Sequence, residues 1–161
     1  MSTLLNPRML LAVTGALSDG LLPPVVTASI NHAVNPSLPV GSGSGNVNIE
    51  FHLPFTVTSG SPLVLDLTNL TDPLGKAIAF AVVTAILLTN DSTTATNDLS
   101  LGGGTNPLVA NCPLPAQASG GAVAFLAPAA GLPVTSGSTN HLQIAANAGS
   151  AVPGRLTILG R

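Results

Sequence analysis

The sequence predicts an all-β protein: an antiparallel β-sandwich of jelly-roll type, or a barrel, with an N-terminal arm. Three observations lead there. Residues 46–53 alternate strictly between apolar and polar side chains, which is the period of a half-buried strand. Other short apolar runs are separated by turn-forming residues, with 17 Gly and 14 Pro in 161 residues. These runs amount to roughly eight or nine strand-length elements, a number typical of a sandwich or barrel.

The first 24 residues are expected to form a separate unit, either an extended arm or a short helix, ahead of a β-sandwich domain at residues 25–161. Four apolar residues recur at every fourth position, which suits one face of a helix. They are Leu5, Met9, Val13 and Leu17. Pro7 and Gly15 weaken the helix, and Pro23-Pro24 ends the segment. The arm has two open alternatives: docking onto a neighbour or packing on its own domain.

The first half of the sandwich domain begins with a β-branched strand at residues 25–30. Residues 41–45, Gly-Ser-Gly-Ser-Gly, are expected to form a flexible loop before the alternating strand. The next strand, residues 63–68, opens after a proline and places three leucines on one face. A turn follows at residues 71–75, which contain Asp-Pro and a glycine.

The second half of the domain opens on residues 77–89, which are apolar almost throughout. Both faces of this segment should therefore be covered, as in one or two central strands. Pro133 marks residues 132–135 as an edge piece, because proline cannot donate a hydrogen bond to a sheet ladder. The remaining strands are expected at residues 98–101, 122–126, 141–145 and 155–159.

The composition points to a subunit that assembles. Only 6% of the residues are charged, against roughly 25% in an ordinary soluble domain. The chain is 45% hydrophobic, so it is not of the disordered class, which is poor in apolar residues and rich in charge. A monomer usually needs more surface charge to stay dispersed. We therefore expect much of the surface to be buried against other copies of the chain.

Several partners and compartments are disfavoured. The net charge is −2 and the four Lys and Arg residues are scattered, so no basic patch is available for nucleic acid. The longest apolar stretch, residues 77–89, is shorter than the about 20 residues of a membrane-spanning helix. Residues 8–13 loosely resemble the start of a signal peptide, but we expect the segment to be retained and the protein to be made in a bacterial cytoplasm. A single cysteine, Cys112, precludes an internal disulfide framework.

No catalytic, cofactor or metal site is predicted. His32, His52 and His141 are far apart and lack the spacing of metal ligands. The six carboxylates are scattered, and several stand in turns, where Asp bonds to its own backbone. A glycosidase pair is disfavoured because the chain lacks the Trp and Tyr on which sugars stack. Residues 102–104 lack the lysine of a phosphate loop. Calcium at residues 90–91 or 97–98 is the best ion alternative.

From Leu65 to its end the chain carries an ordered series of motifs. They are Leu65-Asp66-Leu67, the Leu-Thr-Asp-Pro-Leu-Gly of residues 70–75, the apolar strand at 78–86, Asn-Asp-Leu-Ser-Leu-Gly-Gly at 97–103, and the segments 121–128, 132–137, 142–147 and 156–160. In this order they resemble a family of small structural proteins of tailed phages and prophages, over somewhat more than half of the chain. The chain departs from that pattern at residues 106–118, which are Pro-rich. The resemblance implies a β-sandwich virion protein without catalytic residues.

The favoured function is a capsid decoration or cement protein, located in the virion. Such proteins, commonly trimers, bind one another and the major capsid protein by burying apolar surface across subunit joints. A tail, baseplate or fibre-associated subunit is the first alternative. A host- or carbohydrate-binding module is the second, and the absence of Trp and Tyr counts against it. The candidate interface residues lie in the N-terminal arm. They are Leu5, Met9, Leu10 and Val13. Deletion of residues 1–20 is expected to weaken assembly and to leave the β domain folded.

Overall fold

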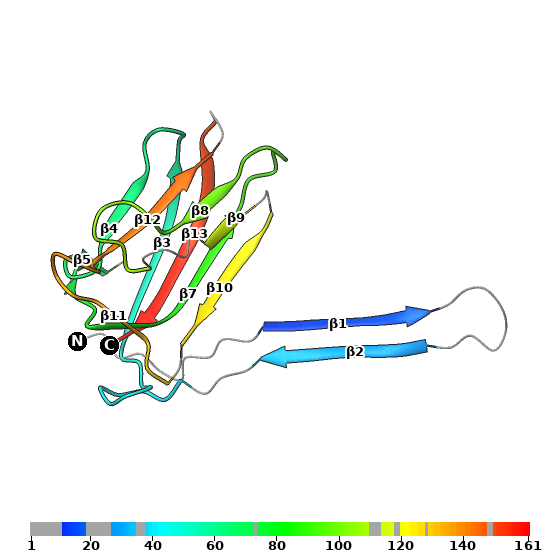
Figure 1. Ribbon diagram of the computed structural model, residues 1–161, viewed down its shortest axis with the longest axis horizontal. Coiled ribbons are helices and arrows are strands. Elements are labelled where there is room, and N and C mark those ends of the chain that lie inside the picture. Colours follow the sequence, from blue (N-terminus) through cyan, green and yellow to red (C-terminus); the bar gives the residue numbers. More distant parts are fainter. Residues whose placement is uncertain are drawn as a thin grey trace.

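The all-β prediction is confirmed by the computed structural model. It describes residues 11–18, 27–34, 38–72, 74–109, 114–117, 120–127, 129–147 and 150–161. The described residues form strands β1 to β13 and contain no helix (Figure 1). Every pairing between these strands is antiparallel.

The larger sheet has the strand order β10-β7-β13-β3, with β11 paired to β7 beyond the end of β10. Its bounds are β3 Ile49–Val57, β7 Val82–Asn90, β10 Ala122–Leu126, β11 Leu132–Pro133 and β13 Val152–Gly160. The predicted apolar run at 77–89 thus supplies the central strand β7. The proline-containing piece at 132–135 supplies only a two-residue strand beside it.

The smaller sheet has the order β4-β12-β8-β9. Its bounds are β4 Leu63–Asp66, β8 Leu99–Leu101, β9 Leu114–Gln117 and β12 His141–Ala146. Two short strands, β5 (Leu70–Thr71) and β6 (Ala77–Ile78), pair with each other on either side of the turn predicted at residues 71–75. In that turn the Asp72 carboxylate accepts hydrogen bonds from the backbone N–H groups of Leu74 and Lys76.

The core lies between the two sheets. Ile86 and Ile158 from the larger sheet pack in one cluster with Leu142 and Ile144 from the smaller sheet, and all four are at most 1% exposed. The sheets therefore face each other as in a β-sandwich. Among the described strands, no ladder joins the two sheets into a closed barrel.

A second, smaller apolar cluster lies on the other side of the larger sheet. Leu38 and Val47 pack there against Ala85 of β7 and Leu159 of β13. The segment that carries them, residues 38–47, turns back on itself, because the Val47 N–H donates to the Pro39 carbonyl at 2.9 Å. One end of the sheet's outer surface is thus covered by the protein's own chain.

Strands β1 (Leu11–Ser18) and β2 (Thr27–Val34) form a separate two-stranded hairpin. It extends away from the sandwich, at the same end as the 38–47 segment (Figure 1). Residues 11–18 are extended, so the helical alternative for the first 24 residues does not apply to them. Residues 1–10 and 19–26 lie outside the described part of the chain, including the predicted boundary at residue 24.

Candidate assembly surface

Of the four predicted interface residues, Leu5, Met9 and Leu10 lie outside the described residues. Val13 stands in the middle of β1, opposite His32 of β2. Its part in an interface stays a prediction. The register of the hairpin nevertheless shows which residues share a face with it.

The hairpin is amphipathic by register. Alternate residues of a strand share one face, and paired residues of the two strands lie side by side on that face. The face that includes Val13 is mainly apolar and is made of Leu11, Val13, Gly15, Leu17, Ala28, Ile30, His32 and Val34. The opposite face is small and polar: Ala12, Thr14, Ala16, Ser18, Thr27, Ser29, Asn31 and Ala33. Neither strand contains an Asp, Glu, Lys or Arg.

Such a hairpin has little stability of its own. An isolated two-stranded ribbon is at best marginally stable in water, because it has only one ladder and no second layer to cover its apolar face. In the described structure the hairpin forms its own sheet and joins neither sheet of the sandwich.

The outer face of the larger sheet offers a low-charge surface. Two cross-strand rows lie there beyond the part covered by residues 38–47. One row is His52, Thr157, Leu87 and Ala124, and the next is Pro54, Arg155, Thr89 and Ala122. We call these eight residues the outer ribbon. Leu87 on β7 and its neighbour Ala124 on the edge strand β10 are half-buried. Leu87 belongs to neither apolar cluster, so the segment of residues 38–47 does not extend over this part of the outer face.

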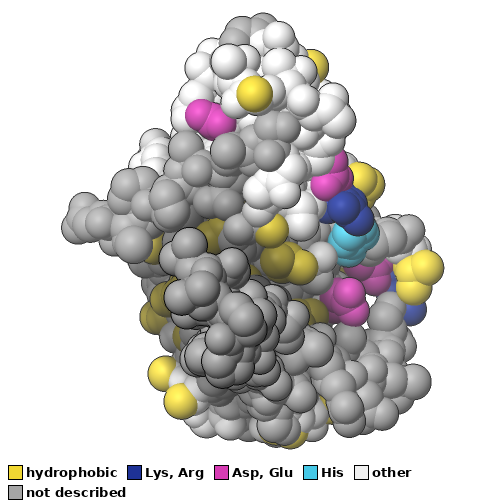
Figure 2. All heavy atoms as spheres, turned by 90° about the vertical axis from the view of Figure 1, so that its right-hand side faces the viewer, with side chains coloured by type: hydrophobic (Ala, Val, Ile, Leu, Met, Phe, Trp, Pro, Cys, Tyr) yellow, Lys and Arg dark blue, Asp and Glu magenta, His cyan; other side chains and the backbone are white. Residues whose placement is uncertain are grey.

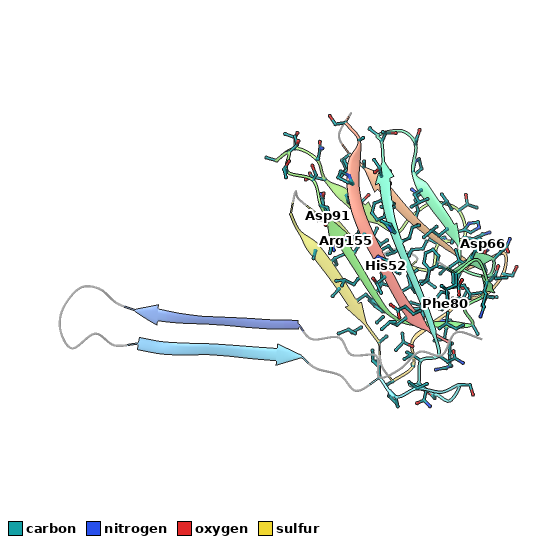
Figure 3. All side chains as sticks on the ribbon, turned by 180° about the vertical axis from the view of Figure 1, so that it is seen from behind. His52, Asp66, Phe80, Asp91 and Arg155 are labelled. Carbon is teal, nitrogen blue, oxygen red and sulfur yellow. The ribbon has the colours of Figure 1, made fainter. Side chains whose placement is uncertain are left out.

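The one Lys, Arg, Asp or Glu of the ribbon is Arg155, which lies between Pro54 and Thr89 in the second row. The Arg155 guanidinium binds both carboxylate oxygens of Asp91, with Nε–Oδ2 at 2.8 Å and Nη2–Oδ1 at 3.0 Å. This fork lowers the pKa of Asp91 and raises the pKa of Arg155, since each charge stabilises the other. The His52 Nδ1 atom lies 3.1 Å from the Thr157 hydroxyl. Figure 3 shows Asp91 and Arg155 together, with His52 further along the same sheet.

The outer face of the smaller sheet also mixes polar and apolar side chains. Its cross-strand rows pair Gln143 with Val64 and Ala145 with Ser100. At the end of the sheet the Asp66 carboxylate accepts hydrogen bonds from the Thr68 hydroxyl, the Asn140 amide and the Thr68 backbone N–H. These bonds lower the pKa of Asp66 below its ordinary value of 3.8.

The loop after β7, considered above as a calcium site, is held by hydrogen bonds among its own residues. The Asn90 amide donates to the Asn97 carbonyl at 2.7 Å, and the Asn97 amide donates to the Ser92 hydroxyl at 3.1 Å. These three side chains are buried, and their hydrogen bonds hold the loop in shape. In the described part of the chain, no three His, Cys, Asp or Glu side chains lie close enough to share a metal ion.

Figure 2 shows the surface chemistry from one side. Among the residues coloured by type, most acidic, basic and histidine side chains gather along the right-hand side of the view, and one acidic side chain lies apart at the upper left. The remainder is neutral polar with scattered hydrophobic side chains. Within the described ranges there is no helix able to cross a membrane.

The sequence analysis missed the outer ribbon, and it predicted a strand at residues 25–30 without its pairing to the N-terminal segment. The spacing of apolar residues could also have indicated this strand of the hairpin, because Ala28, Ile30 and Val34 stand an even number of residues apart in β2. The outer ribbon has no such spacing pattern in the sequence. Leu87 stands inside an apolar run whose two faces the sequence does not distinguish. Its neighbours Ala124 and Thr157 are 37 and 70 residues away in the chain, and only the register shows that they lie beside it. Comparisons of this chain with protein-family models, curated proteins and solved structures found no match.

Proposed function

We propose that the protein is a non-enzymatic structural subunit of a tailed-phage virion, and more specifically a capsid decoration or cement protein. One structural observation supports assembly above all others. A hairpin whose two strands contain no Asp, Glu, Lys or Arg, with one mainly apolar face by register, forms a sheet of its own beside the two sheets of the sandwich. The resemblance of the motifs between Leu65 and the end of the chain supports the virion assignment.

The low charge of the chain suits an interface formed by burying apolar surface. Burying apolar surface is worth roughly 25 cal/mol per Å² and needs no directional contact. Burying a charge carries a desolvation penalty that often exceeds the gain from its partner. A subunit with 6% charged residues avoids most of that penalty when its surface is covered by neighbours.

The polar groups that the structure brings together serve the fold. Asp66, Asn140 and Thr68 fasten a turn, and Asn90, Ser92 and Asn97 hold a loop. Their use in structural hydrogen bonds supports a structural role in preference to catalysis.

The test is the copy number in purified virions, measured by quantitative peptide mass spectrometry and scaled to the major capsid protein. Hundreds of copies per particle, retained through a density gradient, are expected for a shell protein. A few to some tens of copies would move the protein to the tail or baseplate and overturn the decoration assignment. Absence from the particles would overturn the virion assignment altogether.

A further inference from the structure

We infer that Pro54 keeps the open edge of the larger sheet from pairing with a strand of a second copy of the protein. Strand β3 stands last in the order of that sheet, and Pro54 lies near the middle of its nine residues. The inference does not depend on the virion assignment, because an open strand edge invites unwanted pairing in any sheet protein.

The direction of the β3 backbone follows from the neighbouring strand β13. The Asp91 N–H donates to the Pro153 carbonyl at 3.0 Å. At the other end of β13, the Arg161 N–H donates to the Val82 carbonyl at 2.9 Å. The backbone groups of Pro153 and Arg161 therefore point toward β7. Because successive residues of a strand alternate in direction, the even-numbered residues among 154–160 point toward β3, where the register pairs them with odd-numbered residues.

The even-numbered residues of β3 consequently direct their backbone groups away from the sheet. They are Glu50, His52, Pro54 and Thr56, and all four are exposed. Among the described strands, none lies beyond β3 in this sheet. Proline has no N–H, so Pro54 stands at a position where it removes no hydrogen bond of the ladder with β13. The edge offers outward N–H groups at residues 50, 52 and 56 and none at residue 54.

This gap opposes the addition of a further strand. An added strand forms hydrogen bonds to every second residue of the edge. At Pro54 the donor is missing, and the Cδ of the ring occupies the direction in which an N–H would point. A neighbouring backbone therefore cannot approach to the about 4.8 Å that separates paired strands at this position. The longest uninterrupted row of outward donors is reduced to the two at Glu50 and His52.

The length of β3 explains why this edge in particular needs an obstacle. The other strands at the ends of the two sheets are β4, β9 and β10, which have four, four and five residues. Short edge strands are protected by their length, because they offer few hydrogen bonds. Strand β3 lacks this protection, and Glu50 is its one Asp, Glu, Lys or Arg. Pro54 is therefore the main obstacle to pairing along this edge.

The test restores the missing donor in the full chain. Pro54→Thr completes a row of four outward N–H groups on a residue type that favours strands. Light scattering after gel filtration at high protein concentration should show at least twice the mass of the wild-type protein, and dilution should reverse the change. A Pro54→Thr variant with the wild-type mass at every concentration would overturn the inference.

The matched control is Pro153→Thr. Pro153 is also exposed, and it lies opposite Thr56 in the register, but it belongs to the inner strand β13. This variant loses the same ring without restoring a donor on the open edge, so it should keep the wild-type mass. An equal rise in mass for both variants would mean that loss of a proline, and not its place on the edge, causes association, which contradicts the inference.

Hydrogen exchange of the wild-type protein is a second measurement, and it does not require that a variant folds. Followed by NMR, the N–H groups of Glu50, His52 and Thr56 should exchange without protection at low and at high protein concentration. The N–H of Phe51, which points toward β13, should exchange at least a hundredfold more slowly. In Pro54→Thr at high concentration, the outward groups should gain at least tenfold protection. Protected outward groups in the wild-type protein would show that the edge is already covered, and the inference would then be wrong.

Discussion

The Asn140 side-chain amide donates a hydrogen bond of 2.9 Å to the Asp66 carboxylate, across 74 residues of sequence. Asp66 ends β4, and Asn140 directly precedes β12, the strand that pairs with β4. The Asn140 backbone carbonyl accepts from the Leu67 N–H at 2.8 Å. Asn140 is 5% exposed. Its hydrogen bond with Asp66 joins the start of β12 to the end of β4, the strand beside it in the sheet.

Removing the Asp66 carboxylate should destabilise the sandwich. Asp66→Ala leaves the buried Asn140 amide without this acceptor, which costs about 1–3 kcal/mol of unfolding free energy. Urea unfolding of the variant beside the wild-type protein measures the loss. Glu50→Ala, on the exposed side of β3, is the control and should change stability by less than about 0.5 kcal/mol. Equal losses of unfolding free energy for both variants would show that the Asp66 contacts stabilise the fold no more than an exposed side chain does.

The same carboxylate predicts a pH dependence. The pKa of Asp66 is lower in the folded protein than its ordinary value of 3.8. The folded state therefore gains stability that is present above that ordinary pKa and lost as the pH falls through the lower folded value. Asp66→Asn cannot titrate at this position. The stability difference between wild type and Asp66→Asn should thus shrink between pH 5 and pH 2, and a constant difference would contradict the role of the charge.

A buried hydroxyl in β7 offers a route to a more stable protein. Thr84 is 1% exposed, and its Oγ1 has no hydrogen-bond partner among the described residues. Thr84→Val keeps the branched shape and removes the unsatisfied group, so it should raise the unfolding free energy by about 1 kcal/mol. Thr84→Ala, which leaves a void, should lower it. Destabilisation by Thr84→Val would indicate that the hydroxyl has a partner such as a bound water.

Leu38 should matter to the stability of the sandwich. In the full chain, Leu38→Ala empties a site that is 3% exposed between Val47, Ala85 and Leu159. The expected loss is about 2–4 kcal/mol. Val40→Ala, at a position 46% exposed, is the matched control and should cost little. A negligible effect of Leu38→Ala in thermal unfolding would mean that the outer cluster adds nothing to stability.

Close packing at Gly160 predicts a severe substitution. A Cβ there would collide with the Val82 carbonyl oxygen and with the Phe80 ring, at the place where the β13–β7 register shifts. Gly160→Ala should lower the unfolding free energy by more than about 2 kcal/mol, because backbone has to move. Gly60→Ala has open space around the new Cβ and only a positive φ of 80° to overcome, so about 1 kcal/mol is expected. Similar losses would show that the sheet adapts at Gly160.

The elements that could be predicted from the sequence are those with a distinctive period. Residues 46–53 alternate, and Phe51 and Val57 of the resulting strand are indeed buried while Glu50 and His52 are exposed. The N-terminal segment shows the limit of the method. A spacing of four brings residues to one face of a helix, but an even spacing also brings them to one face of a strand. Val13 and Leu17 therefore fit both structures, and only pairing with β2 selects the strand.

Strand β9 could not be predicted from local signals. Its four residues include Pro115, and the surrounding Pro-rich stretch reads as a loop. A proline is tolerated in it because β9 stands last in the order of the smaller sheet. The outer ribbon was equally hidden, because it depends on which strands lie beside β7 and in which register. Long-range pairing thus determines the candidate surface, while local period determines most of the strands.

The position of β13 has a consequence for how the protein is made. This strand lies between β7 and β3, and the Arg161 backbone still exchanges hydrogen bonds with Val82. Both of its neighbours leave the ribosome long before it does. The hairpin β1–β2, whose contacts are local, can form first, whereas the larger sheet has a gap at its centre until residues 152–161 have emerged. Nascent chains would therefore expose two unpaired strand edges until that point, which raises the risk of aggregation while β13 is still missing.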